Sequence, residues 1–150
     1  MGHTYTKITV QVVFSTKNRI PYLSNNCRAR VFDYLGGILR GIDCDPHAIN
    51  GVADRVHFLF RVPASLAVAD AVRVVKANSS RWIHENALIH RSFAWQTGYS
   101  AFSVSESRLR EVVSYIQEQE THHRKVSFQE ELIAFLKQHG LFYNEKYLWT

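Results

Sequence analysis

Three short segments of this sequence carry side chains whose type and spacing could support chemistry. The first contains Arg55 and His57, which would share one face of a strand because alternate residues point the same way. The second contains Tyr115 and Gln119, which a helix would place one above the other. The third is Glu120-Thr121-His122-His123-Arg124-Lys125, where a histidine pair beside two cations could bind a metal or a phosphate.

Each segment taken singly also has an ordinary structural explanation. A lone histidine on a strand is commonly a hydrogen-bonded structural residue. A tyrosine followed by a glutamine is commonly a half-buried ring beside a surface amide. Adjacent residues on a helix point in different directions, so the histidine pair could also mark a helix end or a solvated turn.

The elements that must position these residues follow from the periodicity of the apolar side chains. The expected elements are a strand at 5–15, a helix from Ser24 or Asn25 to about Leu39 with its stop at Gly41, strands at 46–50 and 55–62 around a turn at 50–54, a helix at 65–85, and strand segments at 93–96 and 99–104. Ser105 is expected to cap the next helix, and a last one would run from Ser127 to His139. The order β-α-β-β-α-β predicts an antiparallel sheet with helices on one face and further C-terminal helices. This is a ferredoxin-like α+β domain.

Composition limits the class of protein. The 150 residues predict a single domain over residues 1–150, and 46% hydrophobic with 21% charged residues excludes a disordered chain. No apolar run approaches the roughly 18 residues that a membrane-spanning helix needs, and two cysteines do not make a disulfide framework. The N-terminus shows no signal-peptide pattern, so we expect a cytoplasmic protein with no membrane partner.

The basic surplus is concentrated in the first half of the chain. Residues 1–75 carry nine Lys or Arg against five Asp or Glu, and residues 76–150 carry nine against eight. A basic half favours an anionic partner, most commonly nucleic acid. Composition alone leaves a merely solvated basic surface as an equal alternative.

Four segments together resemble the transposases of insertion-sequence-200-like elements, which include the REP-associated tyrosine transposases. These are small single-tyrosine enzymes of the HUH class, named for a His-hydrophobic-His motif. The segments are Val12-Val13-Phe14-Ser15-Thr16-Lys17-Asn18-Arg19, Gly51-Val52-Ala53-Asp54-Arg55-Val56-His57, Trp95-Gln96-Thr97-Gly98-Tyr99-Ser100-Ala101-Phe102-Ser103-Val104-Ser105 and Tyr115-Ile116-Gln117-Glu118-Gln119-Glu120-Thr121-His122-His123. They span nearly the whole chain in the family's order.

The resemblance implies a DNA transposase that binds a hairpin in single-stranded DNA at mobile-element ends. Tyr115 would attack a backbone phosphorus and leave a 5′-phosphotyrosine, through which strands are later rejoined. A divalent cation, Mg²⁺ or Mn²⁺, would be held by the two motif histidines and by Gln119. Family members are commonly dimers in which the tyrosine-bearing helix of one chain completes the metal site of the other. The resemblance therefore implies that Tyr115 and Gln119 act together with His57 of the partner subunit. Lys17, Arg19 and Arg55 are the residues expected to contact DNA.

The sequence departs from the family motif at one position, where Arg55 stands for the first histidine. Arginine offers no lone pair, so only His57 and Gln119 remain as metal ligands. Three alternatives follow. In the first, Arg55 destroys the metal site and leaves a catalytically impaired or repurposed single-stranded DNA-binding protein. In the second, the Arg55 guanidinium binds the phosphate in place of the cation. In the third, a nearby residue such as His47 supplies the missing ligand, although we expect His47 to face away from His57.

Overall fold

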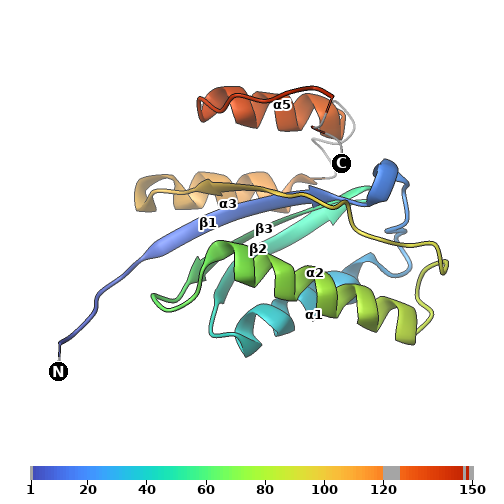
Figure 1. The fold of residues 1–150 in the computed structure, drawn as a ribbon, viewed down its shortest axis with the longest axis horizontal. Coiled ribbons are helices and arrows are strands. Elements are labelled where there is room, and N and C mark those ends of the chain that lie inside the picture. The colour runs from blue at the N-terminus through green and yellow to red at the C-terminus, as the bar shows by residue number, and fades with distance from the viewer. Residues whose placement is uncertain (1, 120–125, 147, 149–150) are drawn as a thin grey trace.

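A four-stranded antiparallel sheet lies at the centre of the computed structural model, which describes residues 2–119, 126–146 and 148 (Figure 1). The strand order is β2-β3-β1-β4. The two central strands are β1 (Ile8–Ser15) and β3 (Arg55–Val62), and the edges are β2 (Asp45–Val52) and β4 (Ser100–Ser103). The central strands are rich in β-branched and aromatic residues, which suit a pleated surface buried on both faces.

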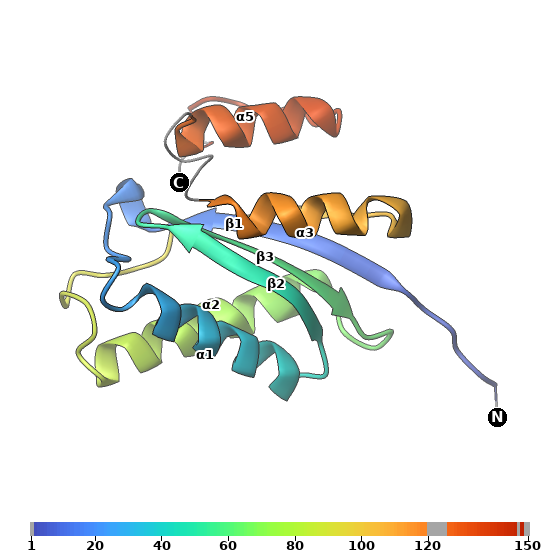
Figure 2. The same ribbon diagram turned by 180° about the vertical axis from the view of Figure 1, so that it is seen from behind.

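Helices cover both faces of this sheet. Figures 1 and 2 show α1 (Arg28–Gly41) and α2 (Val68–Glu85) on one face, with α3 (Leu109–Gln117) and α5 (Phe128–Gln138) on the other. The element order and the sheet confirm the predicted ferredoxin-like α+β fold. Among the described residues, no helix is long and apolar enough to cross a lipid bilayer.

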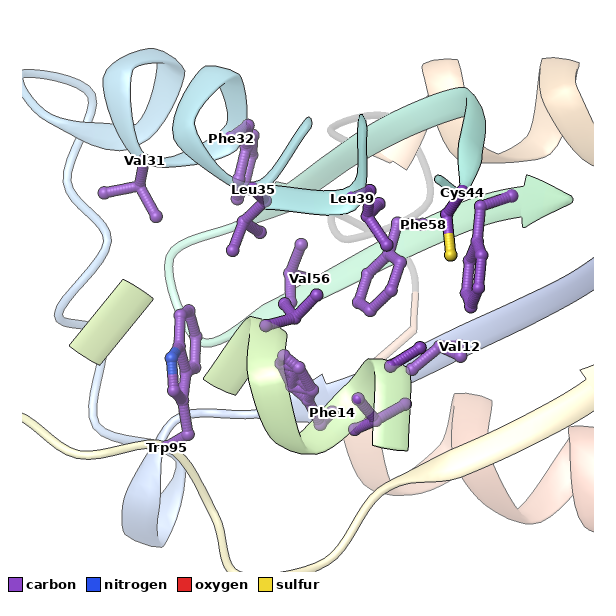
Figure 3. Packing of buried hydrophobic residues seen from close by; sticks show 14 of the residues in the cluster. Val12, Phe14, Val31, Phe32, Leu35, Leu39, Cys44, Val56, Phe58 and Trp95 are labelled. Atoms are coloured by element: carbon purple, nitrogen blue, oxygen red, sulfur yellow. The ribbon is translucent and has the colours of Figure 1, made fainter. Parts of the chain in front are cut away.

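The main hydrophobic core lies between the sheet and helices α1 and α2. Figure 3 shows Val12, Phe14, Val56 and Phe58 of the central strands pointing toward this layer. Burial of these side chains, each worth about 1.5–3 kcal/mol, holds the two central strands in register. The members of the core that α1 contributes are Val31, Phe32, Leu35 and Leu39.

A second, smaller core lies on the opposite face. Val13 of β1 and Phe102 of β4 are covered by three residues of α5, namely Phe128, Leu132 and Leu136. Successive residues of a strand point to opposite faces, so Val13 belongs to this core while its neighbours belong to the main one. Helix α5 therefore lies over the β1–β4 half of the sheet.

Several predicted boundaries were wrong in detail. Helix α1 begins at Arg28 rather than at Ser24 or Asn25, although it does end at Gly41, and α2 begins at Val68. Strand β2 extends to Val52, so the hairpin turn contains only Ala53 and Asp54. The expected strand at 93–96 is reduced to one bridge between Thr16 and Trp95. A 3-10 turn, Glu106–Arg108, separates Ser105 from α3, so Ser105 does not cap that helix.

Candidate active site

Strand β3 presents Arg55 and His57 on the face that α3 and α5 cover. Both side chains are completely buried, and Val56 between them lies in the main core, so the predicted shared face is confirmed. His57 pairs with Val13 across the sheet, which places Gln11 diagonally beside it on the same face. Gln11 Nε2 lies 3.4 Å from His57 Nδ1. Gln11, expected inside the first strand, is therefore a buried neighbour of the site.

Helix α3 brings Tyr115 over the same face of the sheet. The rings of Tyr115 and His57 lie 6.0 Å apart, centroid to centroid. The helix ends at Gln117, so Gln119 does not share a continuous helix with Tyr115 as predicted. Gln119 is nevertheless completely buried, and its Nε2 lies 3.5 Å from the carbonyl oxygen of Tyr115. The predicted nucleophile and both remaining predicted ligands thus meet within one chain.

Strand β2 contributes two residues that position the others. Asn50 Nδ2 donates to the carbonyl oxygens of Ile116 and Gln117, both at 3.1 Å, and so holds the last turn of α3 against the sheet. A Cβ added at Gly51 would lie 2.9 Å from Cα of Val56 and closer still to the carbonyl oxygen of Arg55. Only glycine lets β2 approach the backbone that carries Arg55 this closely.

Helix α5 supplies the residue that joins the site together, Glu131. Its Oε1 lies 2.8 Å from His57 Nε2 and 3.0 Å from Arg55 Nε. Its Oε2 accepts a short hydrogen bond from the Tyr115 hydroxyl. Nε2 of His57 is directed at the carboxylate and therefore carries a proton, while Nδ1 faces the Gln11 amide.

The charges in this cluster act on one another. Burial by itself raises the pKa of Glu131, but the hydrogen bond and charge of His57, the charge of Arg55 and the Tyr115 hydrogen bond lower it to about 2. Burial, followed by the Glu131 carboxylate, raises the pKa of Tyr115 well above its ordinary value. A hydrogen bond from Gln119 and the charge of Arg55 act in the opposite direction. Tyr115 is therefore held as a protonated phenol beside an ionised carboxylate.

Arg55 is held by further contacts. Its guanidinium lies 3.3 Å from Asp54 Oδ1 and donates to the carbonyl oxygen of Val126 at 3.2 Å. Its Nε lies within ion-pair distance of Glu131, but within the described residues the Nε–H makes no hydrogen bond. The carbonyl oxygen of the Gln119 side chain is likewise buried without a hydrogen-bond partner in the described part of the chain. Buried polar atoms nearly always make a hydrogen bond, so these two unpaired atoms indicate that this arrangement leaves a donor and an acceptor unsatisfied.

A cavity of about 430 Å³ opens beside Tyr115. It lies between the β1–β4 half of the sheet, α3 and α5. Its wall includes the site residues Gln11 and Tyr115, the rings of Phe135 and His139, and Arg108. The phenol of Tyr115 can therefore be reached from this side while Arg55 and His57 stay covered.

The remaining predicted site residues lie around this cluster. Lys17 and Arg19 form a short 3-10 turn, Lys17–Arg19, directly after β1, whose last residue pairs with Arg55. They therefore lie at the end of the sheet where Arg55 begins β3. His47 instead lines a cleft against α1 together with Phe32 and Asp33, so it does not face His57, as expected. The histidine pair at 122–123 lies outside the described residues.

The donor set does not fit a divalent cation. His57 Nε2 is directed at Glu131, and the guanidinium of Arg55 lies against the same carboxylate. Among the described residues, no group of three or more His, Cys, Asp or Glu side chains could hold a metal ion. Mg²⁺ needs near-octahedral oxygen coordination, which a fixed neighbouring cation opposes. No catalytic step is therefore assigned to a metal here.

Glu131 is the site residue that sequence reasoning missed. It belongs to no motif and follows Arg55 by 76 positions in the sequence. One signal was available, because Glu131 falls on the apolar stripe of α5 formed by Phe128, Leu132 and Phe135. A carboxylate on the buried face of an amphipathic helix indicates a buried cationic partner.

Two solved structures share this fold. A candidate transposase from Deinococcus radiodurans R1 matches with a TM-score of 0.64 and 23% identity, covering 79% of this chain and 96% of that one. A REP-associated tyrosine transposase bound to a REP hairpin matches with a TM-score of 0.62 and 17% identity, covering 84% of this chain and 74% of that one. Among curated protein sequences, none matches this chain.

The family comparison agrees with the geometry. The model of the family described as "Transposase IS200 like" matches residues 4–119, which include Arg55, His57, Tyr115 and Gln119. Glu131 and helix α5 lie beyond the matched region. Because the match covers more than three quarters of the chain, with the same residues gathered on one face of the expected fold, this protein belongs to the IS200-like transposase family.

Proposed function

We propose that this transposase binds a hairpin in single-stranded DNA and cleaves and rejoins strands through Tyr115. The observation that supports this most strongly is the meeting of Tyr115, His57 and Gln119 within one buried cluster. The comparison with a REP-associated tyrosine transposase bound to a REP hairpin supports a hairpin as the substrate. A cytoplasmic location, where such DNA would be met, stays a prediction.

The chemistry is a pair of transesterifications. Oη of Tyr115 attacks the phosphorus of a phosphodiester, the new P–Oη bond forms, and the bond to the 3′ oxygen breaks. The phenolic proton leaves and the 3′ oxygen gains one, so the step is balanced. A 3′ hydroxyl later attacks the 5′-phosphotyrosine and releases the phenol. Each step exchanges one ester bond for another, so no external energy source is required.

The basic end of the sheet is the proposed path of the DNA backbone. Lys17, which is exposed, and Arg19 lie directly after β1, next to the start of β3. Cations in a turn suit contacts to phosphates, which position a nucleic acid without reading its sequence. Arg55 belongs to this set only if the phosphate enters the buried cluster.

A dimer completed in trans also stays a prediction. Tyr115 and His57 are already brought together within a single chain, so one protomer contains the residues that the resemblance divides between two. Light scattering on the protein with and without DNA measures the oligomeric state. A monomer that still cleaves DNA would contradict the dimer.

A covalent-adduct assay tests the proposed cleavage. Labelled single-stranded DNA spanning the hairpins that flank the gene is mixed with protein, with and without Mg²⁺ or Mn²⁺, and run on a denaturing gel. We expect a protein–DNA band that Tyr115→Phe abolishes and that Tyr5→Phe, a change at an exposed tyrosine, leaves intact. A band that survives Tyr115→Phe would contradict the assignment of the nucleophile. A band that requires the metal would confirm the cofactor prediction despite the donor set.

The Arg55–Glu131 ion pair favours a second candidate, a catalytically impaired protein that still binds hairpin DNA. Both groups are buried, and the carboxylate lies where an anionic substrate would have to approach Tyr115. Arg55→His restores the family motif. An adduct seen only with Arg55→His and added metal would support this candidate, whereas an adduct with the unaltered protein would exclude it.

A further inference from the structure

We propose that Arg55, His57 and Tyr115 form a binding site for one phosphodiester group, and that Glu131 occupies this site as an internal substitute for the phosphate. The proposal rests on the proposed function. It adds that Arg55 binds the phosphate group of the DNA and that helix α5 must move to admit it. We call these three side chains the anion cradle. DNA would enter the anion cradle only when α5 withdraws Glu131.

The first argument is the chemistry of the contacts. The anion cradle directs a guanidinium, an imidazole and a phenol hydroxyl at one carboxylate. All three are groups that bind phosphate oxygens equally well, and arginine suits phosphate in particular. A phosphodiester carries one negative charge, as the carboxylate does. Exchanging one for the other therefore keeps the charge of the buried cluster unchanged.

The second argument is the fit of the carboxylate. Among the residues that the structure describes, the buried Nε–H of Arg55 makes no hydrogen bond, although Nε lies only 3.0 Å from Oε1 of Glu131. Each carboxylate oxygen can accept two hydrogen bonds, so Oε1 fails to accept from the Nε–H because of its direction and not because His57 already uses it. A phosphodiester offers two non-bridging oxygens in a tetrahedral arrangement together with its ester oxygens. The unpaired donor is thus explained by a ligand of different shape.

The third argument is the cost of an empty anion cradle. Arg55 is completely buried, and Asp54 at 3.3 Å compensates it only in part. Removing one partner of a buried pair leaves an uncompensated charge, so withdrawal of Glu131 is opposed unless another anion replaces it. The cavity beside Tyr115 supplies a route by which that anion can arrive.

The fourth argument is the position of Tyr115. Its hydroxyl is bound to the same carboxylate, so a phosphate in the anion cradle would lie next to the nucleophile. One helix would therefore control the access of a phosphate to the proposed nucleophile. In this arrangement Arg55 neutralises the charge of the phosphate, the role that the resemblance gives to a metal ion.

The test uses dimethyl phosphate, a phosphodiester with a single negative charge, and the full chain. Glu131→Gln removes the internal anion, and Glu130→Gln changes an exposed glutamate on the same helix as a matched control. Binding is followed by NMR through the Arg55 Nε–H resonance. We expect Glu131→Gln to bind dimethyl phosphate about tenfold more tightly than Glu130→Gln, because the internal competitor is absent. Added dimethyl phosphate should also raise the Tm of Glu131→Gln more than that of Glu130→Gln.

Equal binding by the two variants, or tighter binding with no shift of the Arg55 resonance, would overturn the proposal. A double variant, Arg55→Gln with Glu131→Gln, should lose the gain. If that variant does not fold, the Arg55 resonance in Glu131→Gln still decides. In the unaltered protein, dimethyl phosphate should accelerate amide exchange in α5 but not in α2, and unchanged exchange in α5 would refute displacement. An intact anion cradle with no covalent adduct would mean that only the proposed cleavage fails.

Discussion

At the scale of single residues, Arg55, which stands where the resemblance to the family implies a histidine, is accompanied by a buried carboxylate. Arg55 and Glu131 are 0% and 3% exposed in their side chains. Two such groups are rarely buried unless each compensates the other. The substitution at position 55 is therefore linked physically to a helix that lies outside the region matched by the family.

This link predicts strong coupling in a double-mutant cycle. Arg55→Met and Glu131→Leu should each lower the free energy of unfolding by about 3–5 kcal/mol, because each leaves a buried charge behind. The double variant should lose less than the sum by at least about 1 kcal/mol. Urea denaturation measures all four proteins. Arg108→Met, at an exposed ion pair with Glu111, is the control and should change stability by less than about 0.5 kcal/mol. Strict additivity would show that the two residues act independently.

At the scale of elements, the position of Tyr115, the proposed nucleophile, depends on an edge strand. Asn50 of β2 binds the last two carbonyl groups of α3, which otherwise have no partner within the helix. The helix has only nine residues, which is too short to be stable in isolation. The position of Tyr115 thus depends on the hydrogen bonds between Asn50 and the end of α3 as much as on the helix itself.

Asn50→Ala should therefore loosen the end of α3. The loss of two hydrogen bonds is expected to cost about 1–2 kcal/mol, which accelerates amide exchange in the turn at 114–118 by roughly 5- to 30-fold. Hydrogen exchange followed by mass spectrometry measures this, and the adduct assay should show reduced yield. Asn86→Ala removes a similar amide-to-carbonyl bond at the end of α2, to Trp82, and should leave α3 unchanged. Equal exchange in the two variants would argue against an anchoring role for Asn50.

At the scale of the whole molecule, the two faces of the sheet carry separate hydrophobic cores. The core under α1 and α2 contains most of the buried hydrophobic side chains of the described residues, whereas α5 is held by a small group around Val13 and Phe102. Regions with few buried apolar contacts open with smaller free energies than the main core. Helix α5 can therefore separate from the sheet without unfolding the rest of the domain.

Leu132→Ala tests this separation of the two cores. The change removes a buried side chain from the small core and should cost about 2–4 kcal/mol locally. Amide protection should fall throughout α5 while protection in α1 and α2 is retained. Leu35→Ala, in the main core, should instead lower protection across the sheet and both of its helices. A uniform loss of protection in Leu132→Ala would mean that the two cores open together.

The sequence by itself determined the fold in general outline and the side chains that are candidates for chemistry. Alternating β-branched residues and helical spacing predicted the strands, the helices and their order along the chain, because these periods show which side chains face the core. They also placed Arg55 and His57 on one face, with Val56 on the other. The ends of helices and the length of the β2–β3 turn were less well predicted, because tertiary contacts such as those of Gly51 and Asn50 decide them.

Only the tertiary structure brought Glu131 to Arg55. The two residues are separated by 76 positions, and no local sequence pattern predicts which buried cation will pair with a buried carboxylate. The same holds for Gln11, which reaches His57 through strand register. Local periodicity dictates which face a residue occupies, but long-range packing decides its partner. Long-range packing therefore explains why Arg55 lies in a buried cluster beside the carboxylate of Glu131.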